Sequence, residues 1–73
     1  MKANLRFFDV ELNGIELRDI NEHVVGFRLP KDVASVELVG KLCNEGASLS
    51  EMGDYLFVTA RRALFEGIKI VEL

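Results

Sequence analysis

Hydrophobic and polar residues alternate with a period of two over most of the first thirty residues. Phe8, Val10 and Leu12 fall on one side of this alternation, and acidic residues fall between them. Such a pattern is typical of a strand with one face in the core and the other face in water. It predicts a half-buried strand that ends at Leu12.

The dipeptide Asn13-Gly14 follows this strand directly. Both residues tolerate the positive φ angles that a two-residue type I′ turn requires. A hairpin at this point places Leu12 opposite Ile15, which makes the apolar side continuous across both strands. The sequence therefore predicts a β-hairpin centred on Asn13-Gly14.

A second turn and renewed alternation over residues 23–29 complete a three-stranded antiparallel meander. Beyond it, apolar residues recur at spacings of three and four, which is typical of a helix. Asp32 is placed to cap a helix that begins near Val33, and Gly46 is placed as its left-handed C-terminal cap. Residues 35–42 also fit a fourth strand, because valines and a glycine lower the helix propensity of this segment.

Two more helices are predicted in the segment that follows. Ser48 and Glu51 have the spacing of a capping box, in which each side chain accepts a hydrogen bond from the other residue's backbone N–H. Apolar residues then recur at helical spacing, and Thr59 is a candidate N-cap for a separate third helix over residues 60–66. Residues 55–60 taken alone also fit a strand.

Gly67 closes the last predicted helix, and residues 68–73 are predicted to form a short final strand. The expected fold is a single α+β domain over residues 1–73. It has the N-terminal meander, two or three short helices in a helix-turn-helix-like arrangement, and the final strand. A mainly β small barrel is the alternative, and it requires residues 55–60 to be a strand.

The formal net charge of −3 is spread evenly along the chain, and no third of the sequence is basic. This distribution counts against a nucleic-acid-binding protein that neutralises many phosphates. Cys43 is the only cysteine, so no intrachain disulfide forms, and a reducing, cytoplasmic setting is expected. The N-terminal segment carries charges throughout and predicts neither a signal peptide nor a membrane span.

Candidate catalytic and metal-binding residues are few. His23, the only histidine, has no nucleophile or second ligand at a telling spacing, and the acidic residues are scattered singly. Cys43 falls on the apolar stripe of the first predicted helix, which favours a small core residue over a reactive thiol. We therefore expect a non-enzymatic protein without a metal or a small-molecule cofactor.

Residues 45–59, EGASLSEMGDYLFVT, resemble the helix-turn-helix of LuxR-type regulators and are similar to region four of sigma factors. The positions identical to the LuxR pattern are Glu45, Gly46, Ser48, Glu51, Leu56 and Phe57. The sequence departs from that pattern at Gly53, where the family has an alanine between the helices, and at Ala63, where a valine is usual. The resemblance covers the C-terminal half of the chain when the preceding helix is included.

This resemblance implies that the second helix of the pair enters the DNA major groove. By position, Ser48 and Thr59 would contact phosphate, and Arg61 or Arg62 would pair with guanine, whose O6/N7 edge matches a guanidinium group. The implied function is a small transcription regulator that contacts DNA or a transcription protein. We expect it to act as a dimer, because one short recognition helix on an acidic domain binds weakly.

A general protein-interaction module or inhibitor that binds no nucleic acid is the alternative. In the predicted meander, Leu5 and Phe7 point away from the core onto a charged face, and Phe65 belongs to the same expected surface. Large apolar groups on an otherwise charged face are typical of an interface with a partner protein or a second copy. Packing by the final strand or a terminal segment explains these residues equally well.

Overall fold

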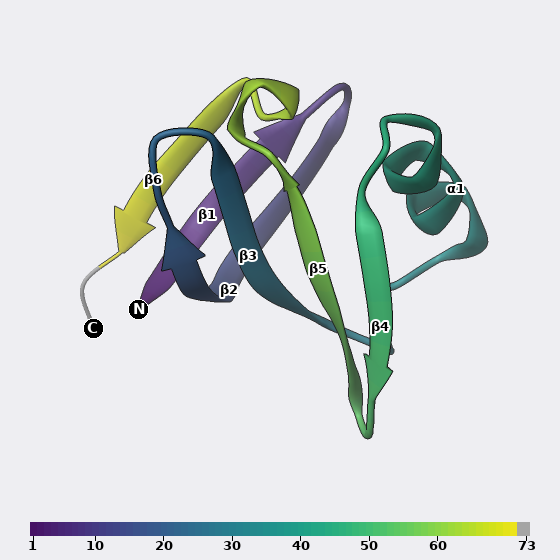
Figure 1. Ribbon diagram of the computed structural model, residues 1–73. Helices are drawn as coiled ribbons and strands as arrows, with labels where there is room; N and C mark the ends of the chain where they lie inside the picture. Colours follow the sequence, from purple (N-terminus) through teal and green to yellow (C-terminus); the bar gives the residue numbers. More distant parts are fainter. Residues whose placement is uncertain (72–73) are drawn as a thin grey trace.

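The computed structural model describes residues 1–71, without the side chains of residues 19 and 20 (Figure 1). Within this range the chain forms six strands, one α-helix and one short 3₁₀ helix. Their bounds are β1 (Lys2–Phe7), β2 (Val10–Ile20), β3 (Val24–Pro30), α1 (Val36–Asn44), β4 (Ser48–Met52), β5 (Tyr55–Arg61), η1 (Arg62–Leu64) and β6 (Gly67–Val71). All strand pairs are antiparallel, and they form one sheet in the order β4-β5-β3-β2-β1-β6.

This architecture is mostly β, so the predicted α+β fold with two or three helices is wrong. The described residues contain one α-helix, and the segment predicted to hold the last two helices joins the sheet instead. The mainly β alternative describes the fold better, although the described strands form an open sheet with β4 and β6 at its edges. In Figure 1 the sheet is strongly twisted, and its strands diverge towards β4.

The first three strands form an antiparallel meander, but its first turn lies at Phe8-Asp9 and not at Asn13-Gly14. Strand β2 continues through Asn13-Gly14, and these two residues together face Asn4 of β1 as a bulge. Gly14 has a φ of +66°, and its N–H donates a 3.0 Å hydrogen bond to Asn4 Oδ1. The positive φ angle of Gly14 therefore occurs in a bulge and not in a two-residue turn. The predicted hairpin at Asn13-Gly14 is wrong.

The bulge also accounts for the apolar pattern on which the wrong hairpin was based. Leu12 and Ile15 are three residues apart, so a regular strand would place them on opposite faces. One extra residue between them restores the alternation, and both side chains are buried in the core. A bulge and a two-residue turn therefore produce the same spacing of apolar residues in the sequence.

The helix predicted after the meander is confirmed as α1, with a later start. Its N-cap is Ser35, whose Oγ accepts a 3.1 Å hydrogen bond from the Leu38 N–H. The helix therefore begins at Val36, and Asp32 is not its cap. The hydroxyl satisfies one of the backbone donors that the first helical turn leaves free.

The end of α1 lies where the sequence predicts it. Gly46 has a φ of +83°, and its N–H donates to the Cys43 carbonyl at 3.0 Å. The Ala47 N–H donates to the Leu42 carbonyl, also at 3.0 Å. These two bonds form a Schellman motif, which satisfies carbonyl groups that have no partner inside the helix.

The predicted helix-turn-helix is wrong, because its segment is the β4–β5 hairpin. Gly53 and Asp54 form the turn, and Gly53 has a φ of +65°. Strand β5 pairs along its whole length with β3 on one side and along most of it with β4 on the other. Its residues include Tyr, Phe, Val and Thr, which favour a pleated strand once neighbours are present on both sides. Ser48 and Thr59 therefore cap no helix and face each other across the hairpin.

The third predicted helix, over residues 60–66, is reduced to the three residues of η1. The final strand is confirmed as β6, which pairs with β1. Residues 72–73 of the predicted strand lie outside the described residues. The 3₁₀ turn reverses the chain and carries it from β5, near one edge of the sheet, to β6 at the other.

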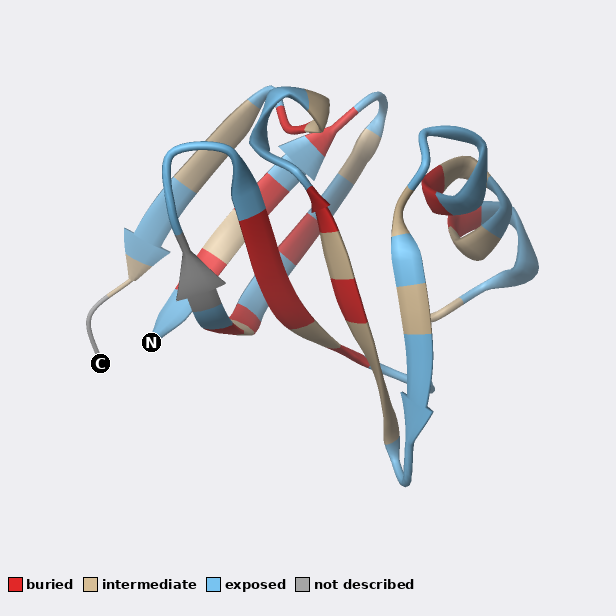
Figure 2. Cartoon of the chain, in the orientation of Figure 1, coloured by how far each residue is buried: buried red, intermediate tan, exposed pale blue. Residues whose placement is uncertain are grey.

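One face of the sheet forms the hydrophobic core, as the buried segments in Figure 2 show. The buried residues are Ala3, Leu5, Phe7, Leu12, Ile15, Leu17, Val25, Phe27, Leu29, Leu38, Leu42, Val58, Ala60 and Phe65. Leu38 and Leu42 come from α1, so the helix covers part of this inner face. No described element covers the opposite, outer face. The helices of the described residues are all too short and polar to cross a membrane.

Candidate functional site

The outer face of β3, β5 and β4 carries large side chains where an antiparallel sheet usually exposes polar ones. The strand register places Arg28, Phe57 and Ser50 side by side in one row. In the next row, Tyr55 lies beside Met52. We call these five residues the aromatic face. In sheets with one solvent-exposed face, apolar side chains normally point to the core and polar side chains point to solvent. This cluster departs from that pattern.

Exposure of the aromatic face differs from that of the core. Met52 is 48% exposed, and Tyr55 and Phe57 are only half-buried. Ser50, which is exposed, leaves one side of the Phe57 row open at the sheet edge. Part of each of these two aromatic side chains is therefore accessible to solvent.

Arg28 lies over the Tyr55 ring, with 5.0 Å between its Cζ and the ring centroid. Its Nε atom is buried and has no hydrogen-bond partner among the described residues. Across the sheet it faces Glu16, whose pKa is lowered mainly by a hydrogen bond from the N-terminal amine and further by the charges of Lys2 and Arg28. The cation–π contact places the guanidinium group over the Tyr55 ring at the surface of the aromatic face.

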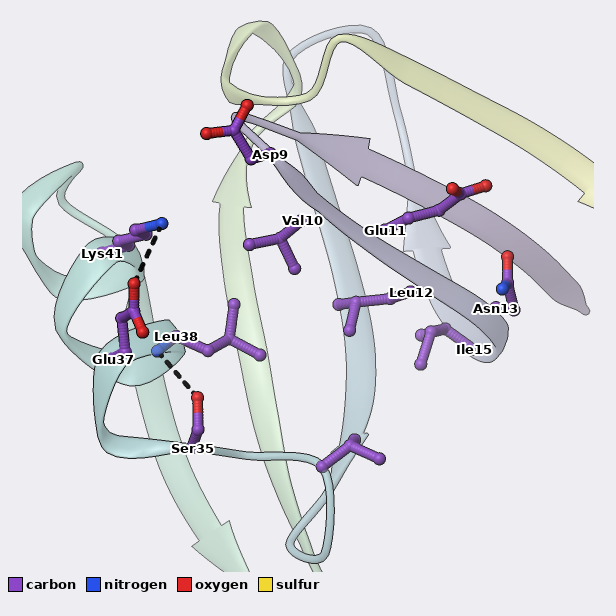
Figure 3. A pocket seen from close by; sticks show the side chains of 11 residues that line it. Asp9, Val10, Glu11, Leu12, Asn13, Ile15, Ser35, Glu37, Leu38 and Lys41 are labelled. Carbon is purple, nitrogen blue, oxygen red and sulfur yellow. Dashed lines mark hydrogen bonds and ion pairs between the residues drawn. The ribbon is translucent and has the colours of Figure 1, made fainter.

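A groove of about 560 Å³ lies on the other side of the molecule, between α1 and β2. Figure 3 shows Val10 and Leu12 of β2 and Leu38 of α1 projecting into the space between the two elements. Val33, 47% exposed, also lines this space. We call it the α1 groove. Leu38, which lines the groove, is one of two buried residues of α1.

Charged residues line the α1 groove from both the β2 and the α1 sides, and Asp9 of the β1–β2 turn is one of them. Lys41 Nζ lies 3.5 Å from Glu37 Oε1 on α1, and Asp9 lies across from this pair (Figure 3). A second hollow of about 300 Å³ shares Asp9 and Lys41 with the groove, and it is lined further by Phe8 and Glu45 among others. The groove therefore continues along the helix towards its C-terminal end.

The residues predicted to bind DNA are not gathered on one helix. Ser48 and Thr59 lie opposite each other in the β4–β5 hairpin, and Arg61 ends β5. Arg62 begins η1, and its backbone N–H donates a 2.8 Å hydrogen bond to the His23 carbonyl. Because the recognition helix is absent, the geometry that the resemblance implied for these four residues is also absent.

The residues predicted to form an exposed interaction surface are in the core. Leu5 and Phe7 are fully buried, and Phe65 is 8% exposed. The prediction of exposure failed because the turn was misplaced: with the turn at Phe8-Asp9, the odd-numbered residues of β1 face inward. Sequence reasoning missed Tyr55 and Phe57, although the strand interpretation of residues 55–60 carried the signal that would have found them.

No group of three or more His, Cys, Asp or Glu residues with the arrangement of a metal site occurs among the described residues. His23 is exposed, and its Nε2 lies 3.9 Å from Glu22 Oε2. Cys43 is exposed, not part of the core as predicted. Comparisons with models of protein families, with curated proteins and with solved structures find no match to this chain.

Proposed function

We propose that the protein is a non-enzymatic protein-interaction module that binds its partner through the aromatic face. The observation that carries the proposal is a sheet face that no described element covers and on which Tyr55 and Phe57 of β5 lie beside the edge strand β4. Aromatic residues, methionine and arginine are the types enriched at the buried centre of protein interfaces. A partner that covers them removes apolar surface from water, which favours association.

Charge on this face indicates what the partner surface contains. Arg28 and Arg61 are the charged residues that β3 and β5 place on the outer face, where Glu16 of β2 lies beside Arg28 and Arg61 has no acidic partner in the adjacent strand. A symmetric dimer through this face would bring the arginines of two copies together, and like charges at an interface are unfavourable. The partner that fits is therefore a different protein with an apolar surface flanked by carboxylates.

A cytoplasmic setting belongs to the same proposal. Cys43 is a free and exposed thiol. Exposed free thiols persist in reducing compartments and are oxidised elsewhere.

Site-specific photo-crosslinking in the protein's native cells tests this function. A photoreactive amino acid replaces Ser50, which is exposed beside Phe57, and in a matched control it replaces Val36, which is 92% exposed on α1. We expect a defined partner to crosslink from position 50 and not from position 36. Purified partner should then bind the Phe57→Ser variant at least about tenfold more weakly, as for a central interface residue.

The unfolding midpoint of Phe57→Ser, measured in urea, establishes that the variant is folded. If Phe57→Ser proves to be unfolded, the Tyr55→Ser variant is used in the binding measurement in its place. Equal crosslinking from both positions, or unchanged affinity in a folded variant, would refute the proposal. Crosslinks between two copies of this chain would show that the aromatic face forms a homodimer and does not bind a different protein.

A further inference from the structure

We infer that the α1 groove binds a short basic peptide segment that inserts an apolar side chain between α1 and β2. The groove is a concave space with an apolar lining from two elements, in contrast to the aromatic face, which belongs to a sheet surface. Val10, Leu12 and Leu38 line it deeply, and the half-exposed Val33 lines its mouth. A branched or unbranched aliphatic side chain is the group that such a lining desolvates best.

The charges along the groove favour a cationic ligand. Glu37 and Lys41 pair with each other and cancel. Asp9 and Glu11 of the groove and Glu45 of the adjoining hollow remain, all exposed and none in an ion pair with a described residue. A lysine or arginine next to the inserted aliphatic side chain meets one or more of these carboxylates.

The length of α1 limits the length of a ligand that lies along it. Helix α1 has nine residues, so it is about 13 Å long at 1.5 Å per residue. An extended chain rises about 3.3 Å per residue, so about four residues match the length of the helix. This length suits a linear segment of a partner protein.

The site is separate from the aromatic face. The groove lies on the inner side of the sheet with α1, and the aromatic face lies on the outer side, which no described element covers. The inference does not depend on the proposed function of the aromatic face.

Nuclear magnetic resonance titration of the full chain tests the inference. The probe is the peptide acetyl-Gly-Lys-Leu-Lys-Leu-Gly-amide, with two matched peptides in which both lysines become glutamate or both leucines become serine. We expect the probe to shift the amide signals of β2 and α1 residues that line the groove. Both altered peptides should bind at least about tenfold more weakly, and added salt should weaken binding of the probe.

Two valines of one segment provide a matched pair of variants. Val33 lines the groove, whereas Val36, three residues later, is 92% exposed and does not line it. Val33→Ser should weaken peptide binding at least about threefold, because apolar contact is lost, and Val36→Ser should leave it unchanged. Asp9→Asn should weaken binding of the lysine peptide and should not weaken binding of the glutamate peptide.

Shifts centred on Tyr55 and Phe57, or no shift at millimolar peptide, would overturn the inference. Equal effects of Val33→Ser and Val36→Ser would also overturn it. Shifts in groove signals that depend on protein concentration without peptide would assign the groove to a second copy of this chain. The Phe57→Ser variant should bind the probe normally, so failure of the aromatic face and failure of the groove are distinguishable.

Discussion

Gly53 and Gly40 are both exposed, and a Cβ atom added to either would meet nothing within 4 Å. Their backbones differ. Gly53 has a φ of +65° in the β4–β5 turn, and Gly40 lies inside α1. Any effect of a methyl group at these positions therefore comes from the backbone and not from packing.

Alanine substitutions at these two glycines should change stability in opposite directions. Gly53→Ala should lower the free energy of unfolding by about 1–2 kcal/mol, because a left-handed conformation is strained for residues with a Cβ atom. Gly40→Ala should raise it by about 0.5–1 kcal/mol, because alanine is the better helix residue. Urea unfolding followed by circular dichroism measures both. A stabilising Gly53→Ala would contradict the hairpin, since that is the sign expected inside a helix.

Strand β4 is an edge element that the sheet pairs on one side, with β5. Leu49 of β4 packs against the core, and Glu51 forms an ion pair with Lys31, the residue that directly follows β3, with 2.8 Å between Oε1 and Nζ. The hydrogen bond from Lys31, followed by its positive charge, lowers the pKa of Glu51. This contact connects the β4–β5 hairpin to the segment that leads into α1.

The Lys31–Glu51 pair should make a small contribution to stability that depends on pH. Because the pKa of Glu51 is lower in the folded state, the contribution is complete above the ordinary glutamate pKa of about 4.3 and is lost as the pH falls through the folded-state value. Glu51→Gln should therefore be less stable than the parent at pH 7 and equal to it once the carboxylate is protonated. Urea unfolding at neutral and acidic pH measures this difference, with Glu45→Gln as the control. A difference that is the same at both pH values would contradict the role of the pair.

At the scale of the whole molecule, Phe65 connects strands that are not neighbours in the sheet. Its ring centroid lies 5.3 Å from that of Phe7 on β1 and 5.8 Å from that of Phe27 on β3. Strand β2 lies between β1 and β3. The segment between η1 and β6 thereby covers one end of the core that the twisted sheet leaves open.

Phe65→Ala should lower the free energy of unfolding by about 3–5 kcal/mol, the range for removing a buried aromatic ring. A chain of this size has a total stability of roughly 4–11 kcal/mol, so the variant should be near its folding limit. Phe65→Leu should lower the free energy of unfolding by less, so that the stability of this variant remains measurable. Phe8→Ala, at a ring that is 41% exposed, is the control and should cost far less. A neutral Phe65→Ala would support an interface role for this residue in place of a core role.

Local patterns predicted the elements whose signals lie within a few residues. Alternation identified strands in the first thirty residues, and helical spacing with Gly46 at its end identified α1. Asn13-Gly14 shows the limit of such signals, because a turn and a bulge use the same positive φ. Only the pairing of β1 with β2, which is a contact between separate segments, distinguishes the two.

The segment from Ser48 to Arg61 was decided by tertiary structure. Its serine and glutamate spacing fits a capping box, and its residues fit a hairpin equally well; pairing of β5 with β3, about thirty residues earlier in the chain, selects the hairpin. The aromatic face exists only because this segment forms a hairpin and not two helices. Composition and periodicity by themselves determined a small acidic chain with an N-terminal meander, a helix and a final strand. Which aromatic rings are buried and which are exposed was decided only when distant strands paired, because that pairing sets the face to which each side chain points.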